Sequence, residues 1–117
     1  MKTAEKISLV KADAVQKRIE ELYGNRDGMV KRQSERFEKL LERFEKDFPE
    51  SECVALVSAP GRTEIGGNHT DHNRGRVLAA AVNLDTVAAV APRQDGKVCL
   101  NSEGYPPIQL DLQDLNI

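Results

Sequence analysis

The first 48 residues combine an apolar spacing typical of helices with dense charge of both signs. One stripe, at i, i+3, i+4, i+7 and i+11, consists of Phe37, Leu40, Leu41, Phe44 and Phe48. A shorter upstream stripe consists of Ala12, Val15, Ile19, Leu22 and Tyr23. Each stripe matches one face of an α-helix. Gly24 can end the first helix in a left-handed conformation, so the pattern predicts two helices joined by "GNRDG".

Opposite charges cover the outer face of the second predicted helix. Glu35 precedes Lys39 by four residues, and Glu42 precedes Lys46 by four residues, a spacing that supports a solvent-facing helix surface. The apolar stripe on the other face must therefore pack against something. It spans too few heptads for a coiled coil, so we favour packing within the molecule over a partner-binding helix pair.

After Pro49 the apolar spacing changes from 3.6 residues to 2. The runs "CVALVSAP", "RVLAAAV" and "DTVAAVAPR" predict strands rich in valine and alanine, and Pro60 and Gly61 are expected to stop the first of them. Asp95 and Gly96 predict a tight hairpin turn between "TVAAVAP" and "KVCLN". The alternation in "PPIQLDL" predicts a last, half-buried strand.

Strands with so many alanines leave room for a helix to approach closely. The predicted fold class is therefore α+β, with N-terminal amphipathic helices packed on a mostly antiparallel sheet. We expect residues 1–49 to form a helical segment and residues 50–117 to form a β-rich segment, and the two together to make one partial domain.

Length, charge and cysteine spacing limit the classes of function. A chain of 117 residues fits one small domain, and a net charge of −2 offers no positive surface for nucleic acid or an anionic membrane. No apolar run reaches the roughly 20 residues of a membrane span, and the start lacks the apolar core of a signal peptide. We therefore expect a cytoplasmic protein in which Cys53 and Cys99, with no CxxC motif, stay reduced.

Residues 59–78, "APGRTEIGGNHTDHNRGRVL", concentrate polar donors and acceptors between two apolar runs. We expect them on the connection between the first two strands, where a rigid scaffold commonly displays binding residues. A phosphate-binding loop fails on chemistry. Gly61 and Gly66 have the spacing of a P-loop, but Gly67 and Asn68 stand where its lysine and its hydroxyl residue are needed.

A metal site is a weaker alternative for the same stretch. His69 and His72 are three residues apart with Asp71 between them, and imidazoles with a carboxylate can bind zinc or iron. The chain has only these two histidines and no supporting cysteine pair. We therefore predict no metal ligands here.

A pocket for a polyol such as a sugar uses the residues more fully. A carboxylate accepts hydrogen bonds from two adjacent hydroxyls, an amide donates and accepts, and an imidazole does either. Asn68, His69 and Asp71 together therefore suit a sugar, and Gly66 and Gly67 would let the backbone approach its ring. Each of these residues taken alone fits an ordinary turn or surface position equally well.

Taken together, "APGRTEIGGNHTDHNRGRVLAAAVNLD" resembles the signature of the galactokinase branch of the GHMP small-molecule kinases. The usual form of that signature is APGR-x-N-[LI]-IGEHTDY-x-x-G-x-VLP, and the resemblance covers about residues 54–104. It implies the partial N-terminal domain of a GHMP-type kinase. For the parent protein it implies ATP-dependent phosphorylation of the C1 hydroxyl of galactose.

The resemblance also implies roles for individual residues. Arg62 matches the arginine beside the reacting hydroxyl, where a guanidinium orients the nucleophile and steadies charge during phosphoryl transfer, so it is the catalytic candidate. His69 and Asp71 match residues that hold the galactose ring through its hydroxyls. They are the substrate-binding candidates, together with Asn68.

Three positions depart from the usual signature. Asn68 stands where the family usually has a glutamate that bonds the C6 hydroxyl, which puts the treatment of C6 in question. Glu64 replaces an asparagine and His72 replaces a tyrosine; these two residues and Gly67 are accessory candidates. The departures leave two alternatives open, a kinase for a different hexose derivative and a non-catalytic galactose-binding sensor.

The remaining kinase machinery of the family has no counterpart up to Ile117. The resemblance therefore implies that ATP and Mg²⁺ bind in the parent enzyme mainly outside this chain, and that the chain is an N-terminal fragment without activity of its own. The expected partners are galactose or a related hexose and the remainder of the kinase chain. A sheet that lacks its remaining strands exposes an edge, so we also expect self-association through that edge.

Overall fold

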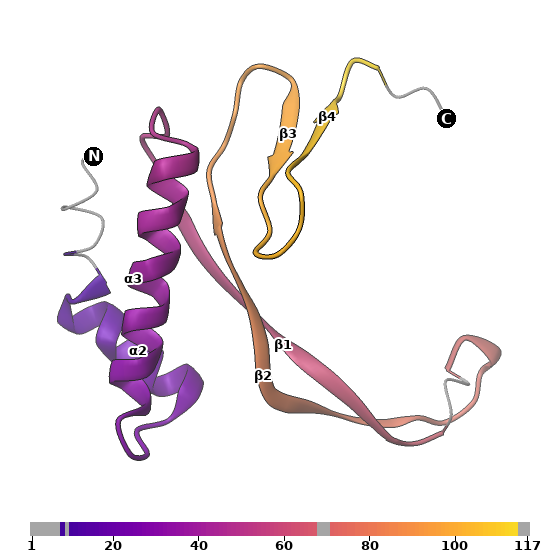
Figure 1. The fold of residues 1–117 in the computed structure, drawn as a ribbon. Coiled ribbons are helices and arrows are strands. Elements are labelled where there is room, and N and C mark those ends of the chain that lie inside the picture. Colours follow the sequence, from indigo (N-terminus) through magenta and orange to yellow (C-terminus); the bar gives the residue numbers. More distant parts are fainter. Residues whose placement is uncertain (1–7, 9, 68–70, 115–117) are drawn as a thin grey trace.

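The computed structural model describes residues 8, 10–67 and 71–114. In that part of the chain, helices α2 and α3 precede two antiparallel strand pairs, β1–β2 and β3–β4 (Figure 1). The elements are α2 Asp13–Tyr23, α3 Met29–Asp47, β1 Ala55–Gly66, a 3-10 turn η1 Asp71–Asn73, β2 Leu78–Val90, β3 Lys97–Leu100 and β4 Ile108–Asp111. The predicted α+β class is confirmed. No helix in the described ranges is long and apolar enough to cross a membrane.

Both helices have the glycine boundaries that the sequence indicates. Gly24 has φ 78°, and its N–H donates to the Glu20 carbonyl oxygen at 2.8 Å, which ends α2. Gly28 has φ 73° and immediately precedes Met29, the first residue of α3. Glycine adopts positive φ at little steric cost, so the short connection can reverse the chain between the helices.

The apolar stripes of the helices meet each other and one face of the β1–β2 pair. Val10, Ile19, Phe37 and Leu41 are buried in one cluster. Partly buried residues pack against that cluster, namely Val15, Tyr23, Val30, Leu40, Val54, Leu56 and Val87. Each fully buried side chain of this size contributes about 1.5–3 kcal/mol, so this cluster holds the helices on the strands.

The first strand does not stop at Pro60 and Gly61 as predicted. β1 continues to Gly66, with a register shift between Pro60 and Arg62. Proline lacks a backbone donor, but β1 pairs only with β2 among the described strands, so its other edge tolerates the missing N–H. A Cβ on Gly61 would lie 2.9 Å from Val82 Cγ2, so glycine keeps the two strands close at the shift.

The predicted second and third strands are one strand, and the predicted hairpin between β2 and β3 is wrong. β3 pairs with β4 instead, from Lys97 opposite Asp111 to Leu100 opposite Ile108. Asp95 and Gly96 do form a turn, with Gly96 at φ 69°. The turn faces β4 because the Gly96 carbonyl accepts a hydrogen bond from the Leu112 N–H at 2.8 Å.

Side chains close this turn locally. Arg93 donates to both carboxylate oxygens of Asp95, at 3.1 and 2.5 Å, and Asp95 also accepts from the Lys97 N–H. Pro92, which has no N–H to donate, follows the end of β2. These contacts separate β2 from β3 although the Asp-Gly pair itself is typical of a hairpin.

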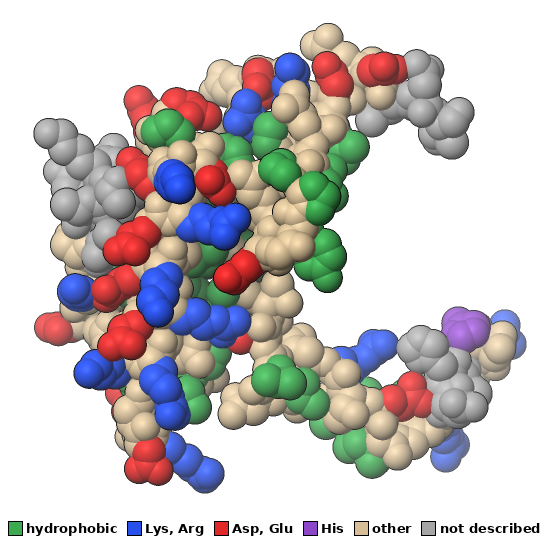
Figure 2. Space-filling view, in the orientation of Figure 1, with side chains coloured by type: hydrophobic (Ala, Val, Ile, Leu, Met, Phe, Trp, Pro, Cys, Tyr) green, Lys and Arg blue, Asp and Glu red, His purple; other side chains and the backbone are tan. Residues whose placement is uncertain are grey.

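The β1–β2 pair continues well beyond the helices as a narrow ribbon (Figure 1). The Cα radius of gyration is 17.9 Å, against roughly 13 Å for a compact domain of this length. The predicted half-burial of β4 is wrong, because all four of its residues are exposed. Figure 2 shows hydrophobic side chains on the strands that border the hollow side of the molecule.

Candidate functional site

The structure places the predicted site stretch at the far end of the β1–β2 ribbon (Figure 1). Arg62 and Glu64 lie on β1, in register with alanines of β2. The prediction that the whole stretch connects two strands is therefore wrong for residues 59–66, which belong to β1. The connection itself consists of residues 67–77, because β1 runs through the proline and glycine that were expected to end it.

Arg62 and Glu64 are two residues apart within a regular part of the pairing, so they lie on the same face of β1. The Arg62 side chain is exposed and that of Glu64 is half-buried. No large side chain of β2 stands directly opposite them, since their register partners are alanines. A guanidinium with five donors and a carboxylate with several acceptor positions are therefore neighbours on one accessible face.

Gly67, directly after β1, is held close to the start of the return strand. Its φ is 112°, and a Cβ there would lie 2.5 Å from the Arg76 carbonyl oxygen and 2.7 Å from the Val77 Cα. A Cβ on neighbouring Gly66 would meet nothing within 4 Å. Gly67 thus has a steric reason within its own chain to be glycine, whereas Gly66 has none.

Two of the remaining candidates, Asn68 and His69, lie outside the described residues. Asp71 begins the turn η1, and His72 follows it with an exposed side chain. The described backbone therefore brings Arg62, Glu64, Gly67 and η1 to the same end of the ribbon, within one hairpin.

The described residues include no group of three or more His, Cys, Asp or Glu side chains that could hold a metal ion. Mg²⁺ takes oxygen ligands in an octahedral arrangement. The described residues at this end of the ribbon do not group enough oxygen donors for that arrangement.

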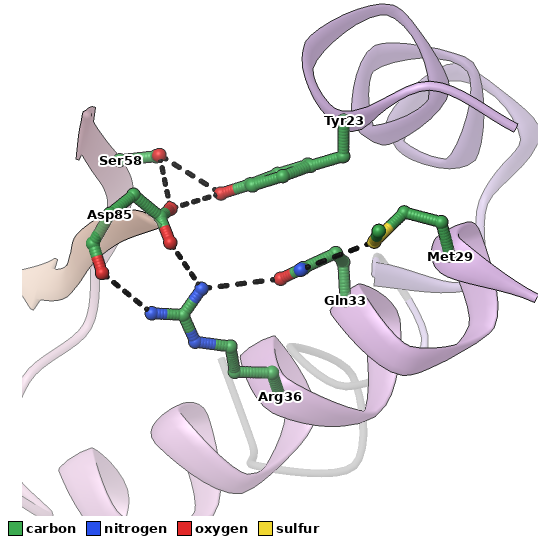
Figure 3. Close-up of polar contacts among 6 residues, drawn as sticks. All are labelled: Tyr23, Met29, Gln33, Arg36, Ser58 and Asp85. Atoms are coloured by element: carbon green, nitrogen blue, oxygen red, sulfur yellow. Dashed lines mark hydrogen bonds and ion pairs between the residues drawn. The ribbon is translucent and has the colours of Figure 1, made fainter. Parts of the chain in front are cut away.

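A second polar cluster, which the sequence did not indicate, joins the helices to the ribbon (Figure 3). Its centre is the Asp85 carboxylate on β2. Asp85 Oδ2 accepts hydrogen bonds from the Tyr23 hydroxyl at 2.5 Å and the Ser58 hydroxyl at 2.6 Å. Arg36 donates to Asp85 Oδ1 at 2.5 Å and to the Asp85 carbonyl oxygen at 3.0 Å. We call these four residues the Asp85 cluster.

The hydrogen bonds determine the charge of this carboxylate. Burial by itself would raise the pKa of Asp85, whose side chain is only 12% exposed. The hydrogen bonds from Ser58, Tyr23 and Arg36 outweigh that effect and lower the pKa of Asp85 to about 2. Burial and the hydrogen bond to Asp85 raise the pKa of Tyr23, so its hydroxyl stays a donor at neutral pH.

One signal in the sequence could have indicated this cluster. Asp85 is the only charged residue among the thirteen of β2, "LAAAVNLDTVAAV". A carboxylate inside a strand with no other charge and mostly apolar residues requires a partner, because burying an unpaired charge is costly. The identity of that partner, Arg36, depends on contacts 49 residues apart in the chain and could not be read from local spacing.

The comparison with known proteins finds a match to the part of the chain that forms the β1–β2 ribbon. Residues 42–92 match a family model described as the galactokinase galactose-binding signature. This segment carries the galactokinase signature. It begins in the second half of α3 and contains β1, the loop with η1, and β2. All the candidate site residues lie inside it, and so do Ser58 and Asp85.

Curated relatives support the same assignment. The chain is 37% identical over 79 residues to a galactokinase of Lactococcus lactis subsp. cremoris, a match that covers 65% of this chain and 20% of that protein. It is 41% identical over 68 residues to a galactokinase of Bacillus subtilis, covering 58% and 17%. It is 48% identical over 63 residues to the human galactokinase, covering 52% and 16%.

The chain therefore spans about a fifth or less of the length of these galactokinases. No solved structure matches it. The resemblance identified from the sequence is confirmed as the galactokinase signature.

Proposed function

We propose that this chain supplies the galactose-binding wall of a sugar 1-kinase of the galactokinase type. The observation that carries this proposal is the match of residues 42–92 to the galactose-binding signature. The ribbon supports it, since Arg62 and Glu64 lie on the same face of β1, near the end of the ribbon that carries the turn η1. Donors and acceptors at such close spacing suit a ligand with many adjacent hydroxyls.

In this proposal each residue has a distinct task. Asp71 accepts hydrogen bonds from two neighbouring hydroxyls of the sugar, and His69 bonds a third. Asn68 bonds the oxygen at C6 as an uncharged donor and acceptor. Arg62 lies beside the C1 hydroxyl, where its fixed positive charge orients the nucleophile and stabilises negative charge as it develops.

ATP and Mg²⁺ belong to the remainder of the kinase chain in this proposal. Phosphoryl transfer needs a phosphate-binding loop, a metal and a positioned base. The described residues offer no metal-binding group, and the match covers only 20% of the Lactococcus lactis subsp. cremoris relative. We therefore expect the 117-residue chain to release no ADP from ATP when galactose is added.

A different hexose is the second candidate. Asn68 replaces the glutamate of the usual signature, and Glu64 and His72 replace an asparagine and a tyrosine. Losing a carboxylate and gaining two donors at position 68 changes which group is favoured at C6. A hexose altered at C6, or one with a 2-acetamido group, would then bind better than galactose.

Calorimetric titration of the chain with sugars tests the proposal. We expect galactose or one of these analogues to bind, and Asp71→Asn to weaken that binding by about 2 kcal/mol or more, roughly thirtyfold. Asp111→Asn on β4 is the matched control and should leave affinity unchanged. Binding that is indifferent to Asp71→Asn, or no binding of any sugar, would refute the proposal.

A further inference from the structure

We propose that the Asp85 cluster positions Arg62 by fixing the β1–β2 ribbon to both helices directly before the ribbon leaves them. The role of Arg62 toward a sugar rests on the function proposed above. The effect of the cluster on the geometry of Arg62 does not, and the two can be tested separately.

The cluster connects four elements through one carboxylate. Tyr23 is the last residue of α2, Arg36 belongs to α3, and Ser58 and Asp85 belong to β1 and β2. Besides the bonds to Asp85, the Tyr23 hydroxyl lies 2.9 Å from Ser58 Oγ. Figure 3 shows the Tyr23 and Arg36 side chains reaching the carboxylate from the helices, and the Ser58 side chain reaching it from the strand. A movement of either helix against either strand must therefore break at least one of these bonds.

The Asp85 cluster lies directly before the register shift at which the ribbon bends. Asp85 is in register with Pro60, and the next residue of β1 with a register partner is Arg62, opposite Ala81. Two steps along β1 therefore correspond to four along β2, so β2 contains extra residues here and the ribbon bends. In Figure 1 the strands leave the helices beyond this region. Arg62 is the first paired residue of the segment that leaves.

Apolar packing alone does not account for the cluster. Leu56 and Val87 already pack against the buried apolar cluster of the helices. Burying a carboxylate with a guanidinium is often no more stabilising than an apolar pair of the same size. Directional hydrogen bonds fix the relative orientation of elements, which non-directional apolar contacts do not. Because this carboxylate lies immediately before the bend, the orientation that it fixes is that of the Arg62 segment.

Nuclear magnetic resonance of the labelled chain without sugar is the first part of the test. The readouts are the backbone amide and side-chain Nε–H signals of Arg62, together with thermal unfolding. Asp85→Asn removes the charge, and Tyr23→Phe removes one hydrogen bond from the same carboxylate. Val87→Ala, on the same face of β2 and half-buried against the apolar cluster of the helices, is the matched control, because it lowers stability without removing any group that bonds Asp85.

We expect Asp85→Asn to shift both Arg62 signals at a temperature where the variant is folded. Tyr23→Phe should shift them in the same direction by less, and Val87→Ala should leave them unchanged. Arg62 signals that are unmoved in both cluster variants, or equally moved by Val87→Ala, would overturn the proposal. If Asp85→Asn does not fold, Tyr23→Phe alone decides by the same criterion.

The second part of the test adds galactose, or the analogue that binds. We expect the affinity for the sugar to fall in Asp85→Asn and to stay unchanged in Val87→Ala. If the unmodified chain binds no sugar, the proposed function fails, while the shifts measured without sugar still decide whether the cluster positions Arg62.

Discussion

At the scale of single residues, two features have physical causes that the structure makes explicit. Asp85 remains ionised although its side chain is largely buried, because three side chains donate hydrogen bonds to it. Gly67 adopts φ 112° with backbone on one side of it, at a distance that excludes a side chain. Each cause predicts the effect of a single substitution.

The lowered pKa of Asp85 makes stability depend on pH. The carboxylate has a pKa of about 2 in the folded chain, below its ordinary value of 3.8. A group whose pKa is lower in the folded state stabilises it above the unfolded pKa and loses that contribution as pH falls through the folded pKa. We expect stability to drop by about 1–2 kcal/mol between about pH 4 and pH 2, with allowance for solvent screening near the surface.

Urea unfolding from pH 6 to pH 2 measures this effect. In Asp85→Asn the free energy of unfolding should change less with pH between about pH 4 and pH 2. Asp111→Asn on β4, which removes a carboxylate outside the Asp85 cluster, supplies the control and should keep the drop in stability between about pH 4 and pH 2. An unchanged profile in Asp85→Asn would contradict the assignment.

Gly67 and Gly66 form a matched pair for a second prediction. Gly67→Ala places a Cβ against the Arg76 carbonyl and Val77 at positive φ, a strain of about 1–3 kcal/mol. Gly66→Ala meets open space and reduces the freedom of the unfolded chain, worth about 0.4–1 kcal/mol in favour of folding. Hydrogen exchange of the Leu78 amide, where β2 begins, should therefore be faster in the first variant and no faster in the second. Equal exchange in both would refute this account.

At the scale of elements, the sequence predicted the helices better than the strand pairing. Helix spacing and glycine boundaries are local, and α2 and α3 lie where the stripes and Gly24 placed them. Strand partners are set by contacts far apart in the chain. Pro60-Gly61 and Asp95-Gly96 both have the composition of turns, yet the first lies within β1 and the second directs β3 toward β4.

The apolar stripe of α3 gives a prediction at this scale. Leu41 is 2% exposed within the core, so Leu41→Ala should reduce the free energy of unfolding by about 2–5 kcal/mol through lost burial and the cavity left behind. Lys39→Ala on the exposed face of the same helix should change it by less than about 0.5 kcal/mol. Chemical unfolding followed by circular dichroism measures both. A Leu41 variant as stable as the Lys39 variant would show that α3 does not pack on the strands.

The candidate site shows the same division between local and distant information. The galactokinase signature is continuous in the sequence, so Arg62, Asn68, His69 and Asp71 could be proposed from the resemblance of this one stretch to the family. The Asp85 cluster could not, because its four members come from four elements. The division of the chain at Pro49 into two segments of one partial domain stays a prediction, as do the roles of the individual site residues.

At the scale of the whole molecule, the described chain leaves much apolar surface uncovered. Large exposed hydrophobic residues lie on both strand pairs, and on the second pair and its flanks they are Val98, Leu100, Tyr105, Ile108, Leu110 and Leu112. Contiguous apolar surface of this kind marks a region that contacts other protein. In the proposed parent enzyme the occupant is the remainder of the kinase chain.

The isolated chain should cover this surface by self-association. Sedimentation should show a mass that rises with concentration, because exposed strands with apolar faces pair readily. Val98 and Leu110 are register partners on β3 and β4, so replacing both with threonine should shift the equilibrium toward monomer. A chain that sediments as a monomer at every concentration would contradict this expectation.

The location of sugar binding is the central claim, and a titration followed by residue-resolved amide signals tests it most directly. As galactose or the analogue that binds is added, the amides of Arg62, Glu64 and Gly67 should shift together along one saturation curve. The amides of Val98 and Leu110, on the other strand pair, should stay in place. Shifts confined to β3 and β4, or a spectrum unchanged by every sugar, would show that the far end of the ribbon is not a sugar site.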